Sequence, residues 1–271
     1  MSNKRKRDDD DEYTNPLSNV PRAPCSIDST ADLPYQPLYP LPKKSFAMYV
    51  VGKPGSGKTN LWLSFFLSKK PKYYRKFFDR AYLVSSSMDT LPSKITDNKR
   101  TGLPKNQMFR ELNDVIIEQI ISQLRSGENG NNLLILDDVI KDIKSSNSLS
   151  KVFLNRRHIT HDKEKEGSSG LSIMVISQVY NLLPLQFRKN MDHIILFKTE
   201  NKQELKFIMD ELLFDLSPEE AKRIMNKAWR KKFGFLLIKA GQPTENKYFD
   251  KFDPIKINLN ESNDDEEYES E

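Results

Sequence analysis

The residues from Gly52 to Thr59 follow the spacing G-x-x-x-x-G-K-[ST], in the order GKPGSGKT. Glycines let a backbone wrap closely around an anion, so that its N–H groups point inward. A helix that starts directly after such a loop aims its first amides at the same place. The pattern therefore indicates a loop that binds a nucleoside triphosphate, in which Lys58 reaches the β- and γ-phosphates and the Thr59 hydroxyl holds magnesium. We expect ATP and Mg²⁺ as cofactors, and we expect the phosphates to be surrounded by Gly52, Pro54, Gly55, Ser56, Gly57, Lys58, Thr59 and Asn60.

Hydrolysis needs an acid near this loop, and the stretch LLILDD supplies two, Asp137 and Asp138. A carboxylate at the end of a neighbouring buried strand can bind the magnesium shell, so Asp137 is predicted to be the second metal-binding residue besides Thr59. Asp138 stands where many ATPases have a glutamate that polarises the attacking water, and we interpret it as catalytic. Aspartate is one methylene shorter than glutamate, which makes this role a hypothesis. A strand-end cap or turn is the structural alternative for the pair.

A third polar residue, Gln178, follows the apolar run LSIMVIS. Ligands of parallel sheets bind beyond the carboxyl ends of the strands, where Gln178 is expected to lie. The side chain could sense the γ-phosphate or orient water, and the alternative is an amide that only satisfies nearby backbone groups.

Apolar runs alternate with helical patterns on both sides of these residues. Predicted strands span 46–51, 81–86, 131–138, 171–177, 193–198 and 233–241, and 246–252 is a candidate partner for the last one. Predicted helices span 58–70, 111–124, 148–157 and 217–231, the last of them with a capping box of Ser217 and Glu220. The helix at 111–124 is expected to bury one face made of Leu112, Val115, Ile116, Gln119 and Ile120. This alternation predicts an α/β P-loop NTPase with a mainly parallel central sheet flanked by helices.

The sequence divides into three parts. Residues 1–43 are Pro-rich and charged and are predicted to form a disordered arm, residues 44–257 the P-loop ATPase domain, and residues 258–271 an acidic disordered tail. The KRKR at 4–7 could be a nuclear import signal, but the DDDDE that follows it favours a solubilising tail slightly more.

The net charge of +5 hides a more basic body. The first twelve residues hold four basic and five acidic side chains, and the last eleven hold seven acidic and no basic ones, which leaves 39 Lys and Arg against 26 Asp and Glu between them, a net +13. Such a charge favours polyanions such as nucleic acid. A well-solvated surface is the alternative, because the positive residues are spread along the chain.

No apolar run approaches the about 18 residues of a membrane span, the first residues lack a signal-peptide core, and the single Cys25 fits a reducing compartment.

Four segments in fixed order resemble the viral DNA-packaging ATPases of the FtsK–HerA superfamily, including the poxvirus type and relatives in giant viruses and virophages. They are GKPGSGKT, LLILDD, the RRH after it, and ISQVYNLLPLQFRKNMDHIILFK, and together they cover roughly residues 45–240. The resemblance implies an ATP-driven motor that pumps double-stranded DNA into a preformed capsid. The matching motif residues are Lys58, Thr59, Asp137, Gln178 and Arg188, whereas Asp138 departs from the usual glutamate.

The resemblance further implies a homo-oligomeric ring, a capsid or portal-vertex partner, and a place in the host cytoplasm (the viral factory) or the virion. In such a ring Arg188 could reach the γ-phosphate held by the neighbouring subunit, or it could pair with a local carboxylate. Arg156 and Arg157 are the rival candidates for the first role.

Two other functions are compatible with the loop. A small-molecule or nucleoside kinase would use an arginine-bearing lid, and NRRHITHDKEKEGSSG at 155–170 could form one. A P-loop scaffold would bind ATP only to assemble. A GTPase is excluded, because NKQE at 201–204 ends in Glu204 where N-K-x-D is needed and no D-x-x-G follows LLIL.

Overall fold

The computed structural model describes residues 37–92, 95, 103–126, 130–144, 146–159 and 170–257. The predicted disordered tails lie outside these residues, except for 37–43 of the N-terminal arm. Those residues pack against the folded part: Leu41 is buried, and the Tyr39 ring lies edge-on to Phe249 at 5.8 Å. The packing of this region therefore starts before residue 44, where the sequence analysis placed the domain boundary.

The described residues form one sheet with the strand order β3-β2-β4-β5-β1-β6-β7-β8-β9. All pairs from β3 to β6 are parallel, and the pairs from β6 to β9 are antiparallel. The strands are β1 Ala47–Val51, β2 Arg80–Ser85, β3 Met108–Phe109, β4 Asn132–Asp137, β5 Leu171–Ser177, β6 His193–Phe197, β7 Phe235–Lys239, β8 Tyr248–Asp250 and β9 Asp253–Pro254. The predicted α/β fold with a mainly parallel sheet is thus confirmed.

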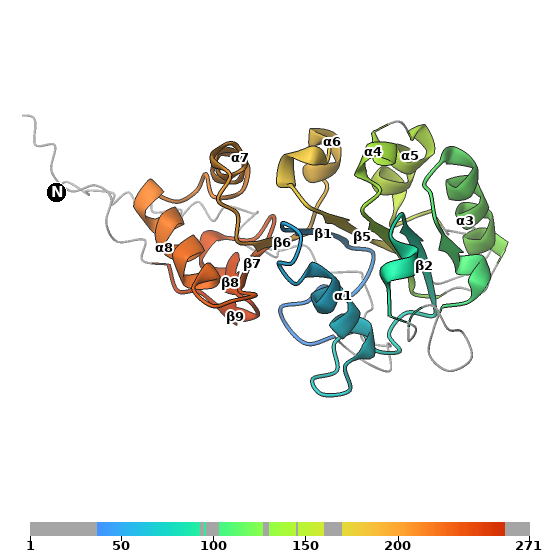
Figure 1. The fold of residues 1–271 in the computed structure, drawn as a ribbon, viewed down its shortest axis with the longest axis horizontal. Coiled ribbons are helices and arrows are strands. Elements are labelled where there is room, and N and C mark those ends of the chain that lie inside the picture. Colours follow the sequence, from blue (N-terminus) through green and yellow to red (C-terminus); the bar gives the residue numbers. More distant parts are fainter. Residues whose placement is uncertain are drawn as a thin grey trace, which may run out of the picture. The chain divides into compact units, whose positions relative to one another are not determined.

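Helices cover both faces of the sheet, with α1 on one side and α3 to α7 on the other (Figure 1). Helix α8 packs against β7 and β8. The helices are α1 Lys58–Leu67, α3 Asp114–Ser126, α4 Ile140–Ile143, α5 Asn147–Asn155, α6 Leu185–Arg188, α7 Lys202–Leu212 and α8 Pro218–Trp229. Short 3-10 turns occur at Met88–Thr90, Lys105–Gln107, Tyr180–Leu182 and Thr244–Asn246. No helix among the described residues has the length and apolar character that a bilayer crossing requires.

The core strands are buried on both faces, as expected for a parallel sheet covered by helices. In β1, Ala47, Tyr49 and Val51 belong to the large core that also includes residues of α3, α5, α7 and α8. On the face with α1, Trp62 and Phe65 are buried, and Phe65 packs against a group of aromatic rings that includes Tyr73 and Tyr74. This double burial fixes the position of β1 and therefore of the loop that follows it.

The predicted buried face of helix 111–124 is only partly correct. Leu112 and Ile120 are buried and Ile116 packs against the core, but the other two predicted residues face solvent. The helix begins at Asp114, Val115 is 77% exposed, and Gln119 is also exposed. The side chains that enter the core are Ile117, Ile120, Ile121 and Leu124. The helix carries two Ile-Ile pairs, at 116–117 and 120–121. Rotating the helix by one residue about its axis therefore exchanges one isoleucine of each pair for the other, and the apolar content of the buried face hardly changes. Packing against the sheet and α5 selects between the two orientations.

The helix at 217–231 agrees with its prediction. The Ser217 hydroxyl accepts a hydrogen bond from the Glu220 backbone amide at 3.2 Å, and Pro218 occupies the first turn. Ala221, Ile224, Met225 and Ala228 are buried.

Candidate functional site

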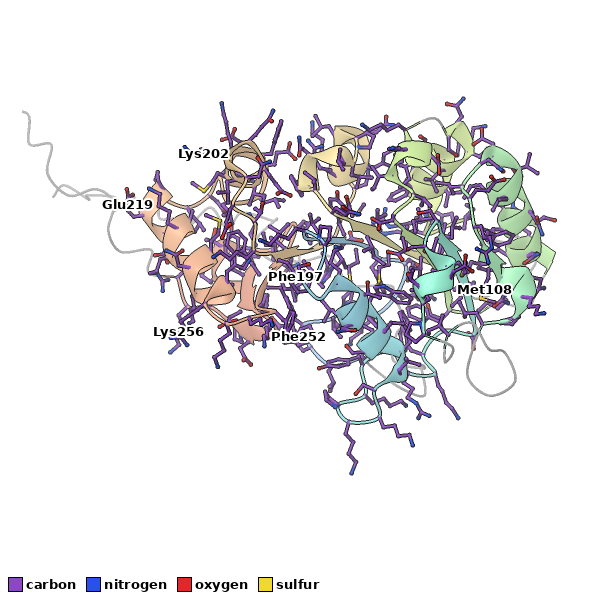
Figure 2. The ribbon with its side chains drawn as sticks, viewed as in Figure 1. Met108, Phe197, Lys202, Glu219, Phe252 and Lys256 are labelled. Atoms are coloured by element: carbon purple, nitrogen blue, oxygen red, sulfur yellow. The ribbon has the colours of Figure 1, made fainter. Side chains whose placement is uncertain are left out.

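The glycine-rich loop connects β1 to α1 and has the backbone that the motif predicts. Gly55 and Gly57 have φ angles of +76° and +104°, which side-chain-bearing residues rarely adopt. At Gly52 the constraint is space, since a Cβ would lie 2.6 Å from Cβ of Phe197. Figure 2 labels Phe197 at the end of β6, close to the start of α1.

Lys58 is the first residue of α1, and its ammonium group points back into the loop. It donates hydrogen bonds to the carbonyl oxygens of Gly52 and of Lys53, the latter at 3.2 Å. Partial burial lowers the pKa of this ammonium group, and the negative charges of Asp138 and Asp137 act in the opposite direction. The loop, the ammonium group and the two carboxylates therefore share one electrostatic site.

Asp137 ends β4 and is only 5% exposed. Its carboxylate accepts a hydrogen bond from the Ser85 hydroxyl at 3.1 Å. Burial raises the pKa of Asp137 to about 6, and the neighbouring Asp138 charge adds to this effect, whereas Ser85 and Lys58 oppose it. A buried carboxylate with such a pKa gains much from a nearby cation.

Asp138 has different surroundings although it is the next residue. It is exposed, and its φ of +55° turns the chain sharply at the end of the strand. The Gln178 amide lies 3.3 and 3.5 Å from its two carboxylate oxygens. Asp138 and Gln178 thus form a polar pair that is open to solvent.

The strand order brings these residues to one edge of the sheet. The loop follows β1, Gln178 follows β5, and Asp137 ends β4, and these strands are consecutive in the order β4-β5-β1. The acidic strand was expected to lie beside the loop strand, but β5 lies between them. Gln178 consequently lies between the acids and the loop. Thr59 and Asn60 are exposed in the first turn of α1.

Arg188 is held by a local carboxylate. Its guanidinium group forms a salt bridge with Glu211 of α7, with Nε–Oε2 and Nη2–Oε1 distances of 2.8 and 2.5 Å, and donates to the Leu183 carbonyl. The hydrogen bonds to Glu211 raise the pKa of Arg188 further. Of the two roles considered for Arg188, this arrangement corresponds to the local ion pair.

The two rival arginines differ from each other. Arg156 is buried and bonded to Asp192 at 2.9 Å and to the Ser45 carbonyl at 3.0 Å. Arg157 is exposed. The rest of the predicted lid, residues 160–169, lies outside the described residues.

Ser85 and Glu204 were not predicted as site residues. Ser85 is the last residue but one of the predicted strand 81–86, and a polar residue near the end of an apolar strand is the signal that pointed to Gln178. Glu204 is buried in α7 and accepts hydrogen bonds from the Tyr180 amide at 2.6 Å and from the Thr199 hydroxyl. It holds the segment after Gln178, and no local pattern indicates that contact.

The loop residues fit a triphosphate with magnesium. The Ser56 hydroxyl is buried without a hydrogen-bond partner among the described residues, and Gly57 caps α1 without a side-chain bond to its first amides. Unpaired donors at a helix start favour an anion. Magnesium is commonly held by one or two carboxylates together with phosphate oxygens. Asp137 can supply the carboxylate, and Thr59 can add its hydroxyl oxygen.

The parallel sheet, the glycine-rich loop with Lys58, and the acidic end of β4 define a P-loop NTPase. The family model described as "Poxvirus A32 protein" matches residues 38–226. The chain belongs to this family, as the resemblance predicted.

Solved structures support the fold. The genome packaging NTPase B204 from Sulfolobus turreted icosahedral virus 2, in complex with sulfate, has 21% identity and a TM-score of 0.53, covering 75% of this chain and 95% of its own. B204 from Sulfolobus turreted icosahedral virus, described as the DNA-packaging ATPase, has 18% identity and a TM-score of 0.52, covering 73% of this chain and 94% of its own. The search of curated proteins gave no significant match.

Proposed function

We propose that this protein is an ATPase that translocates double-stranded DNA and packages a viral genome into a preformed capsid. One observation carries the proposal. The glycine-rich loop, the two acids at the end of β4 and Gln178 lie together at the carboxyl ends of the parallel strands, in a chain of the poxvirus A32 family. The B204 structures, which carry the words genome packaging and DNA-packaging in their descriptions, share the fold over about three quarters of the chain.

Each site residue has a role that follows from its position. Magnesium bound with the triphosphate would neutralise charge on the β- and γ-oxygens. Thr59 and Asp137 would hold the ion, and Lys58 would leave the loop carbonyls to contact the phosphates. The exposed carboxylate of Asp138 would accept a proton from the attacking water, while Gln178 orients that water or contacts the γ-phosphate.

The DNA partner is proposed from charge. A motor that must move any sequence needs a contact that carries no sequence information, and the phosphate backbone offers it. The net +13 between residues 13 and 260 supplies the opposite charge.

Assembly and location belong to the same proposal. A homo-oligomeric ring would let one subunit supply an arginine to the site of the next, and Arg157, the exposed one of the three candidates, is now the preferred residue. A capsid or portal-vertex protein would be the docking partner. The viral factory in the host cytoplasm, or the virion, would be the place of action.

The kinase function is not favoured. Its expected lid contained Arg156, which is buried on Asp192 and unavailable to a substrate. Neither the matched family nor the two B204 structures are described as kinases. The scaffold function is also not favoured. A protein that only binds ATP would not need the two acids suited to hydrolysis that lie near the phosphate loop.

The test is an ATPase assay with and without double-stranded DNA, read together with solution mass. We expect DNA to raise the rate, and Lys58→Ala to lower it by roughly 10²-fold or more. Lys69→Ala, a change of an exposed lysine just beyond α1, is the matched control and should retain the wild-type rate. A rate indifferent to DNA would reject the translocase, and wild-type turnover by Lys58→Ala would reject the site.

A further inference from the structure

A cavity of about 330 Å³ lies beside the phosphate loop. Lys53, Gly55 and Ser56 of the loop form one wall, and Phe197 and Lys198 at the end of β6 form another. The remaining wall is the turn between α8 and β7, from Trp229 to Gly234. None of the described residues that line this cavity is acidic.

The cavity lies on the nucleoside side of the loop. Asp137 would help hold the magnesium ion that accompanies the triphosphate, so the γ-phosphate would lie on the Asp137 side of the loop. Asp137 is on β4, which lies on one side of β1, whereas β6 and β7 lie on the other side. A triphosphate in the loop therefore directs its ribose and base toward β6 and β7, where this cavity opens.

Phe233 is the unusual residue of this cavity. Its φ is +60°, a value that costs energy for a bulky side chain, and its side chain is 51% exposed. The ring packs over the loop: a Cβ built on Gly57 would lie 3.1 Å from Cδ1 of Phe233. The Lys232 ammonium group lies 5.0 Å from the ring centroid. An exposed aromatic ring kept in a strained conformation against a phosphate loop indicates a binding function and not a packing one.

We propose that this cavity binds the nucleobase and that the Phe233 ring is its stacking platform. The inference rests on the proposed binding of a nucleoside triphosphate at Lys58. Stacking on an aromatic ring tolerates different bases, because every base has a π-face. The described part of the lining has no carboxylate to receive the N–H groups of guanine, so we expect ATP and GTP to bind with affinities within a few-fold of each other.

The experiment compares ATP with inorganic tripolyphosphate, which has the phosphates but no base, by calorimetry on the full chain. Stacking on one aromatic ring is worth about 1–3 kcal/mol, so Phe233→Ala should weaken ATP binding about 5- to 150-fold. Binding of tripolyphosphate should stay within about twofold of the wild type. Lys58→Ala should weaken both ligands.

Three further variants separate stacking from folding. Phe233→Trp should retain ATP affinity. Phe233→Gly relieves the strained φ, so it should fold at least as stably as Phe233→Ala and still lose ATP affinity. Phe214→Ala, which removes an exposed ring from the loop between α7 and α8, should change neither ligand.

Three results with Phe233→Ala would overturn the inference. They are an unchanged affinity for ATP, an equal loss of affinity for ATP and for tripolyphosphate, and a variant whose main defect is weaker DNA binding. A wild type that binds ATP no better than tripolyphosphate would also overturn it. The proposed translocase is tested separately, because a lack of DNA-stimulated turnover would leave the difference between ATP and tripolyphosphate intact.

Discussion

Asp137 and Asp138 are adjacent in sequence, but only Asp137 is buried. Asp137→Asn should impair magnesium-dependent ATP binding and turnover together, since it removes a metal-binding charge. Asp138→Asn should leave the dissociation constant near the wild-type value and lower kcat by about 10²- to 10⁴-fold, the usual contribution of a general base. Calorimetry with MgATP and steady-state kinetics measure the two quantities. Equal binding by both variants, with turnover lost only in Asp137→Asn, would reverse the two roles.

Asp137 also makes the stability of the nucleotide-free protein depend on pH. Its pKa of about 6 lies above the ordinary 3.8, so ionisation of this buried carboxyl destabilises the fold as the pH rises from about 4 to 6. At neutral pH the cost is about 3 kcal/mol. Asp137→Asn should therefore raise the free energy of unfolding at pH 7 by up to that amount, and the gain should vanish below about pH 4. Denaturant titrations without nucleotide measure it, and a gain that persists at pH 3.5 would contradict this account.

The sequence was sufficient to nominate most residues of the candidate site one by one. Lys58 and Thr59 follow from a motif with fixed spacing, and Asp137 and Gln178 follow from polar residues that end apolar strands. The partner of Arg188 could not be predicted, because Glu211 is 23 residues away and its contact depends on how α7 packs. The same holds for Phe233, whose contact with Gly57 joins opposite ends of the described chain.

At the scale of elements, the segment between β5 and β6 is fixed to α7 by a network of polar contacts. Tyr180 donates its amide to Glu204 and its hydroxyl to Glu211, and Arg188 completes the network. The Tyr49 hydroxyl reaches the carbonyls of Val179 and Tyr180 from β1. Gln178 precedes this segment directly, so the network sets where its side chain can lie.

Arg188→Ala should act through this network. It leaves the partly buried Glu211 without its cation, which should lower the free energy of unfolding by about 3 kcal/mol. Adding Glu211→Gln should recover part of the loss, since the unpaired charge is then removed. Thermal or denaturant unfolding of the two single variants and the double variant measures the coupling.

A mixing experiment separates this role from a contribution to a neighbouring subunit. In rings shown to co-assemble, adding Lys58→Ala subunits to Arg188→Ala subunits should not raise the activity above that of Arg188→Ala alone, whereas Arg157→Ala subunits mixed with Lys58→Ala subunits should regain some activity. Recovery with Arg188→Ala would mean that the ion pair opens in the ring and that Arg188 acts on the next site.

The sequence predicted the elements more reliably than the orientation of their faces. Strand β5 was predicted with its bounds, because its apolar run is bounded by polar residues. The phase of α3 was not, since residues on either side of its apolar stripe have similar hydrophobicity and tertiary packing decides between them. Helices α4 and α6 are only four residues long, too short for a helical period to appear.

At the scale of the whole molecule, the basic body predicts how DNA binds. Affinity should fall by about 10³-fold or more between about 50 and 200 mM salt if six or more phosphates are contacted, and it should hardly depend on sequence. We hypothesise that the seven acidic side chains of residues 261–271 compete with DNA for the basic surface, so removing these residues should tighten binding. Fluorescence anisotropy on duplexes of unrelated sequence tests both points. A preferred site with affinity indifferent to salt would contradict the proposed motor.

The sheet ends in two-residue strands on both sides, β3 at Met108–Phe109 and β9 at Asp253–Pro254. A long free edge would offer a row of unpaired amides and carbonyls to another copy of the chain and invite fibre growth. Here β9 is short, carries a charge, and contains a proline that has no amide hydrogen to donate. The two edges of the described sheet therefore offer few backbone groups for joining sheets of different copies into continuous fibrils. In the proposed ring, contacts between copies would then be made by side chains and not by paired strands, and such contacts would break and re-form more readily as nucleotide or DNA binds.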